Sequence, residues 1–194
     1  MITFSFYFFV FIRVLCMVLT DRKQINGKLI YKKYVALIFQ IAVLPLLLIL
    51  YVNNIISYYR ILYFGINYFL SDIPGIIYQK DYKYLFHHFL AFFFYYIAIY
   101  YVSKNLYTYI LKNVVLMELG SSMLSIDLIF NYKVIIKNKH NIFLLSRVLT
   151  MINTYLLCLK INSFFINISI IFFFGLLMIH NFGIYQYLKY KSRK

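Results

Sequence analysis

The chain has 194 residues, of which 64% are hydrophobic and 22% are aromatic, and its mean hydropathy is +0.79. A soluble domain of this size cannot bury so much apolar surface, so the composition excludes a soluble globular protein and indicates an integral membrane protein. The formal net charge of +15 would suggest nucleic-acid binding in a soluble chain. Here the basic residues lie between apolar runs, so they indicate a membrane topology, and no nucleic-acid partner is expected.

Seven apolar runs follow one another along the chain, each near the roughly 20 residues that a helix needs to cross a bilayer core. Helices are expected because they satisfy their own backbone polar groups in lipid. The sequence therefore predicts an all-α fold, a polytopic membrane helical bundle of about seven transmembrane helices. The predicted spans are 2–19, 34–53, 56–78, 84–102, 105–129, 142–160 and 163–187.

Local signals refine the ends and the regularity of these spans. Asp72, Pro74 and Gly75 interrupt the third run, which makes it the least regular of the seven. Pro45 and Pro74 are expected to kink their helices, because proline removes a backbone hydrogen bond. Asp81 stands where its carboxylate can cap the N-terminus of the fourth span.

The loop charges predict an orientation. With the N-terminus outside and the sides alternating, fourteen Lys and Arg residues fall on the inner side, and three (Arg60, Lys104 and Lys160) fall on the outer side. Lys and Arg concentrate on the cytoplasmic side of membrane proteins. The sequence therefore predicts a lumenal N-terminus and a cytosolic C-terminus.

His87 and His88 stand side by side near the cytosolic end of the fourth predicted span. Ionisable side chains inside hydrocarbon are costly and usually have a use. Imidazole titrates near neutral pH, so this pair is the candidate catalytic site, acting as a nucleophile or general base. The alternative is that both rings reach toward the interface beside Tyr82 and Tyr84.

A polar stripe marks the fifth predicted span. Glu118, Ser121, Ser122 and Ser125 follow the spacing i, i+3, i+4 and i+7, which places them on one helix face. Such a face turns toward protein or water, and the sequence predicts that it lines a polar cavity. The alternative for the serines is close helix packing, with hydrogen bonds across the helix interface.

Further ionisable groups are expected at similar depth in other spans. Asp72, Arg147 and His180 all fall in the cytosolic half of their spans. Arg147 is expected to pair with Glu118 or Asp72, or else to reach anionic head groups. These residues are predicted to line one lipid-binding cavity with Glu118 and the serines, although His180 equally suits helix packing. No cysteine or histidine spacing suits a metal, so neither a metal nor another cofactor is expected.

Four landmarks occur in an order that resembles the TLC-domain family, which includes the translocating-chain-associating protein and the Lag ceramide synthases. They are Phe69-Leu70-Ser71-Asp72, then His87-His88, then Met117-Glu118-Leu119-Gly120-Ser121, and then Arg147 before a last aromatic-rich helix. The resemblance covers roughly residues 32–190. It implies a six-helix bundle after one leading helix, in the endoplasmic reticulum.

The resemblance divides the chain into a leading helix and loop (1–31), a TLC domain (32–190) and a basic cytosolic tail (191–194). It implies a function in membrane lipid composition or homeostasis, with membrane lipids as partners. The alternative is a ceramide-synthase-like acyltransferase that takes an acyl group from acyl-CoA to a sphingoid base. The synthases carry a His-Asp-x-x-Asp motif where this chain reads Glu118-Leu119-Gly120-Ser121-Ser122, which favours the first function. Whether the protein is an enzyme therefore stays open at this point.

Overall fold

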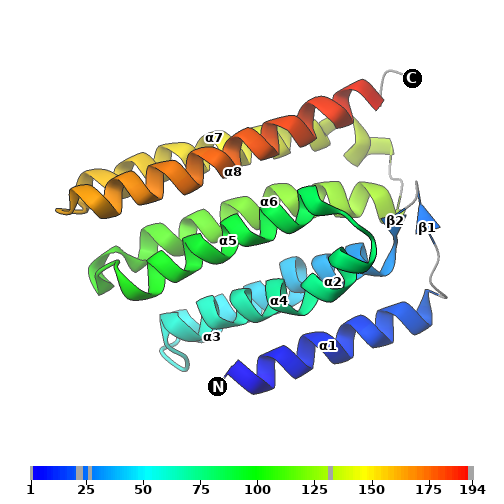
Figure 1. Ribbon diagram of the computed structural model, residues 1–194, viewed down its shortest axis with the longest axis horizontal. Coiled ribbons are helices and arrows are strands. Elements are labelled where there is room, and N and C mark those ends of the chain that lie inside the picture. Colours follow the sequence, from blue (N-terminus) through cyan, green and yellow to red (C-terminus); the bar gives the residue numbers. More distant parts are fainter. Residues whose placement is uncertain (1, 21–23, 26–27, 131–132, 192–194) are drawn as a thin grey trace. The chain divides into compact units, whose positions relative to one another are not determined.

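The protein is a bundle of helices, as the sequence predicts. The computed structural model describes residues 2–20, 24–25, 28–130 and 133–191 (Figure 1). Residues 192–194 of the predicted tail and residues 21–23 and 26–27 of the first loop lie outside this range. The helices are α1 (Ile2–Leu19), α2 (Tyr31–Ile38), α3 (Leu44–Val52), α4 (Tyr58–Tyr78), α5 (Tyr82–Tyr100), α6 (Tyr107–Phe130), α7 (Lys133–Lys160) and α8 (Phe164–Lys191).

The only strands among the described residues are two very short ones between α1 and α2. β1 (Gln24–Ile25) pairs antiparallel with β2 (Lys28–Leu29), so that Gln24 lies opposite Leu29. The apolar periodicity does not predict this pairing. This two-stranded pairing involves four residues between α1 and α2. It is too small to change the fold class, which is all-α.

The second predicted span is one helical rod of three parts. A π-helical segment (Phe39–Val43) separates α2 from α3, and Pro45 follows directly at the start of α3. Proline supplies no backbone N–H, and a wider helical turn before it is a common way to accommodate that loss. The irregularity expected at Pro45 therefore takes the form of a π-bulge.

The third and fourth predicted spans meet in a tight turn. α4 runs on through Pro74 to Tyr78, despite the interruption that the sequence suggested. Lys80 then adopts a positive φ of 54°, and the amide of Asp81 donates back to Ile76, which closes the helix end. The carboxylate of Asp81 accepts from the Tyr84 amide at 3.3 Å, which confirms the predicted cap of α5.

Three helical segments are long and apolar enough to cross a membrane, by length and composition, among the residues that the structure describes. They are Tyr31–Val52, Tyr58–Tyr78 and Asn138–Lys160. Shorter apolar helices occupy Phe4–Leu19, Tyr84–Tyr100 and Phe164–His180. The chain is therefore an apolar helical protein with the character of a membrane protein.

The chain forms two compact units. Unit 1 comprises Met1–Asp72 and Ser121–Lys139, and unit 2 comprises Ile73–Gly120 and His140–Lys194. In unit 1, α1 packs against α2 around an aromatic core. The ring of Phe9 meets Phe39 and Tyr68 edge-on, and these two rings stack with centroids 4.4 Å apart.

Within unit 2, an apolar interface joins α5 to α8 and polar side chains join α6 to α7. α5 packs against α8 (Figure 1), where the rings of Phe93 and Phe173 stack at 5.0 Å. Between α6 and α7, the amide of Asn153 donates to the side chain of Asn113, which in turn donates to Thr154. These three side chains are buried, and hydrogen bonds of this kind join helices in lipid.

Candidate functional site

Arg147 is the most deeply buried cation of unit 2 among the described residues. Its side chain on α7 is 5% exposed. Nη1 donates to the carbonyl oxygen of Met117 at 2.8 Å and to the hydroxyl of Ser146 at 3.2 Å. The guanidinium carbon also lies 4.3 Å from the ring centroid of Phe143, a cation–π contact. The guanidinium thus hydrogen-bonds to the backbone of α6 and also contacts an aromatic ring on its own helix, α7.

Gly120 makes this arrangement possible. A Cβ at Gly120 would overlap the Ser146 hydroxyl and lie 2.8 Å from Nη1 of Arg147. The absence of a side chain therefore lets α7 bring both polar groups against the backbone of α6. The glycine at this position therefore has a packing reason.

Glu118 lies half-buried on α6, one residue after the carbonyl that Arg147 binds. It attracts Arg147 electrostatically and also interacts with the buried Tyr95 of α5. Two opposite charges near each other lower the cost of placing either in an apolar region. Glu118 and Arg147 thus belong to one polar centre of unit 2, where α5, α6 and α7 contribute.

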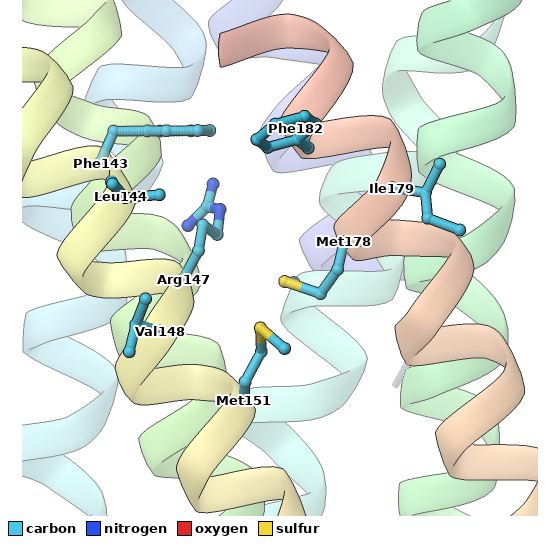
Figure 2. A pocket seen from close by; sticks show the side chains of 8 residues that line it. All are labelled: Phe143, Leu144, Arg147, Val148, Met151, Met178, Ile179 and Phe182. Carbon is cyan, nitrogen blue, oxygen red and sulfur yellow. The ribbon is translucent and has the colours of Figure 1, made fainter. Parts of the chain in front are cut away.

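An apolar cavity of about 310 Å³ adjoins Arg147 (Figure 2). This volume is within the usual range of small-molecule pockets. Met178 and Phe182 from α8 point toward Arg147 and Phe143 on α7. The lining residues are Phe143, Leu144, Arg147, Val148, Met151, Met178, Ile179 and Phe182.

The cavity opens onto an apolar face of unit 2. Its lining side chains Val148, Met151 and Phe182 are 43%, 53% and 56% exposed, respectively. On a membrane helix, exposed apolar side chains face the hydrocarbon of the bilayer. Arg147 is the one charged side chain among the described residues that line this cavity.

The histidines form a separate aromatic cluster on α5 and α8. The rings of His87 and His180 lie 5.4 Å apart, and Tyr84 lies 4.7 Å from His88 and 5.9 Å from His87. His88 is 2% exposed, whereas His87 and His180 are half-buried. The structure thus brings together three histidines from two predicted spans.

One ring nitrogen of His88 is positioned by the helix backbone. Its Nδ1 lies 3.1 Å from the carbonyl oxygen of Tyr84, one turn earlier on α5. In the tautomer that makes this hydrogen bond, Nδ1 carries the proton and Nε2 does not. Among the described residues, no group of three or more His, Cys, Asp or Glu side chains is arranged to hold a metal ion.

Asp72, expected in the same cavity, lies in unit 1 and is bound to α1. Its Oδ1 accepts from Nη1 of Arg13 at 2.8 Å, and both side chains are buried. Arg13 also donates from Nε to Ser71 at 2.9 Å and from Nη2 to the Tyr68 carbonyl at 3.1 Å. Arg147 was expected as a possible partner of Asp72, and no partner was expected for Arg13. One feature of the sequence could have suggested this pair: Arg13 and Asp72 are oppositely charged residues, and each stands inside an apolar run.

The predicted serine face is buried in part. Ser122 and Ser125 are 4% and 2% exposed, whereas Ser121 is half-buried. The hydroxyl of Ser125 donates to the carbonyl oxygen of Ser121 at 3.3 Å, one turn earlier. That hydrogen bond satisfies Ser125 within its own helix, as small hydroxyl residues often do in membrane helices.

Arg147 is the one described residue that both the sequence prediction and the 310 Å³ cavity share. Among the described residues, the lining of the 310 Å³ cavity includes Arg147 but not His87, His88, Glu118 or His180. The apolar side chains that line it on α7 and α8 carried no recognisable motif. Their one sequence signal is spacing, since Leu144, Val148 and Met151 recur at helical intervals on α7.

No protein-family model matches the chain, no curated protein matches its sequence, and no solved structure matches its fold. The function must therefore be argued from the geometry of the site itself.

Proposed function

We propose that this protein is a TLC-type membrane protein that binds a lipid or an acyl chain in its bundle and so influences membrane lipid composition. The proposed setting is the endoplasmic reticulum. Seven spans, a lumenal N-terminus and a cytosolic C-terminus are proposed, and the loop charges support that orientation. The single observation that carries the binding function is the 310 Å³ cavity beside Arg147.

The chemistry of the cavity suits a lipid. Its lining is apolar except for one guanidinium, and five of the eight lining side chains are exposed on an apolar face. Two of them are methionines, whose flexible thioether side chains adapt to ligands of varied shape. An acyl chain can lie among these side chains without exposing polar groups to the bilayer.

Filling the cavity should remove the ligand. We expect Met178→Trp to lower the lipid that co-purifies with the protein by about tenfold or more, equivalent to about 1.4 kcal/mol of binding free energy. Tryptophan is larger than methionine and Met178 points toward α7, so the new ring would occupy the cavity. The measurement is lipid extraction and mass spectrometry of the purified protein.

Ile171→Trp provides the matched control, because Ile171 is on the same helix, is 59% exposed and does not line the cavity. Its bound lipid should equal that of the unaltered protein. Both variants should be monodisperse in detergent. If the Met178→Trp variant then carries as much lipid as the unaltered protein, lipid does not occupy this cavity.

A second candidate function is acyl transfer, and His88 is the observation that favours it. With Nδ1 donating to the Tyr84 carbonyl, Nε2 would be the ring nitrogen that accepts the proton of an attacking amine. The amine nitrogen would form an amide bond to the acyl carbon, the thioester C–S bond would break, and coenzyme A would leave as the thiol. The basic loops would attract the anionic acyl-CoA.

The two candidates differ in one assay. Purified protein is incubated with acyl-CoA and a sphingoid base, and release of free coenzyme A thiol is measured for the unaltered protein and for His87→Ala and His88→Ala. Lipid binding without turnover predicts no release above the buffer rate. Release that His88→Ala abolishes would make acyl transfer the function of the protein.

A further inference from the structure

Arg147 stands at the boundary between two environments. Through Nη1 it is tied to α6, by the Met117 carbonyl, and on the other side it lines the apolar cavity. Figure 2 shows its guanidinium extending into the space between Phe143 on α7 and Phe182 on α8. A ligand in the cavity therefore meets the guanidinium of Arg147 among otherwise apolar side chains.

Charge complementarity selects the head group of that ligand. In a low-dielectric site, a guanidinium interacts far more strongly with an anion than it does in water. Its planar array of N–H donors matches carboxylate and phosphate oxygens, with two parallel hydrogen bonds. A neutral head group would gain only ordinary hydrogen bonds, so the site discriminates by charge.

The rest of the cavity selects the tail. Val148 follows Arg147 directly on α7, Met151 lies about one turn farther along that helix, and Met178 faces them from α8. These side chains offer apolar contact alone. The ligand that fits both parts has an acidic head at Arg147 and a hydrocarbon tail along α7.

We infer that the cavity binds an acidic amphiphile, whose carboxylate or phosphate pairs with Arg147 while its acyl chain lies along Val148, Met151 and Met178. This inference rests on the proposed lipid-binding function and adds the charge of the ligand. A free fatty acid and an anionic phospholipid share this chemistry. Glu118 attracts the same guanidinium from α6, so it competes with the ligand for Arg147.

The test compares ligands that differ in their head groups. Binding of oleate, oleyl alcohol, dioleoyl phosphatidic acid and dioleoyl phosphatidylcholine to the delipidated protein is measured by native mass spectrometry in a neutral detergent. We expect at least one of the two acids to bind about tenfold tighter than its neutral counterpart, a difference of about 1.4 kcal/mol. Oleate binding would identify a free fatty acid, and phosphatidic acid binding would identify a phospholipid.

Three variants locate the charge that is responsible. Arg147→Met should abolish the preference for acids, and Arg147→Lys should keep part of it, because lysine retains the charge but not the paired donors. Glu118→Gln should strengthen acid binding, because it removes the competing carboxylate. Lys104→Met is the control, since Lys104 is exposed and does not line the cavity. This variant should prefer acidic ligands as strongly as the unaltered protein does.

The outcomes separate this inference from the proposed function. Equal binding of acids and neutral ligands would overturn the acidic head group and leave lipid binding intact. Binding of none of the four ligands would overturn both. If Arg147→Met does not fold, the ligand comparison in the unaltered protein and the opposite expected effects of Arg147→Lys and Glu118→Gln still decide the question.

Discussion

Replacing Arg13 with methionine, or Asp72 with asparagine, should destabilise the protein by about 3 kcal/mol or more. The two side chains form a buried ion pair at 2.8 Å between α1 and α4. Removing one partner leaves the other charge in an apolar region with its hydrogen-bond network broken. The measurement is the free energy of unfolding by SDS in mixed detergent micelles.

The double variant distinguishes a stranded charge from lost packing. Arg13→Met combined with Asp72→Asn should be more stable than either single variant, because no charge remains unpaired. Arg60→Met is the control, since Arg60 is an exposed cation on α4, and its effect should stay within about 0.5 kcal/mol. Additive losses in the double variant would show that Arg13 and Asp72 act independently.

Replacing Gly120 with alanine should cost about 1–3 kcal/mol of unfolding free energy, because the added methyl group overpacks a closed interface. The new Cβ would overlap the Ser146 hydroxyl and press on Nη1 of Arg147. α7 must then move away from α6, or Arg147 must give up its bond to the Met117 carbonyl. The same variant should therefore also weaken the binding of acidic amphiphiles.

Gly175→Ala is the matched control for that prediction. Gly175 lies on α8, and nothing comes within 4 Å of a Cβ built there. Alanine has the higher helix propensity, so this variant should be neutral or more stable by up to about 1 kcal/mol. If both alanine variants behaved alike, the close approach of α6 and α7 at Gly120 would not limit stability.

The fold class and most helix ends were predictable from local sequence alone. An apolar run of about 20 residues has few options besides a helix in a membrane, because each backbone polar group must be satisfied within the segment. The end of α1 at Leu19 and the end of α7 at Lys160 coincide with the ends of their apolar runs. The cap at Asp81 was predictable for the same reason, since its partner, Tyr84, is three residues away.

The response of each helix to its proline was not predictable from the sequence. Pro45 and Pro74 were both expected to kink their helices. The structure places a π-helical segment before Pro45 and lets α4 continue through Pro74. Proline leaves the carbonyl group one turn earlier without its usual hydrogen bond. That carbonyl can be satisfied in several ways, and the packing around each helix determines which one occurs.

Sequence periodicity by itself determined that the chain is a helical protein of membrane character, and which residues share a helix face. Only the tertiary structure decided which faces meet. Arg13 and Asp72 are 59 residues apart, and Arg147 and Met117 are 30 apart. A helical repeat fixes the direction of a side chain on its own helix but says nothing of the partner helix. That choice depends on close packing, here on the absence of a side chain at Gly120, which lets α7 place Arg147 against α6 and beside the cavity.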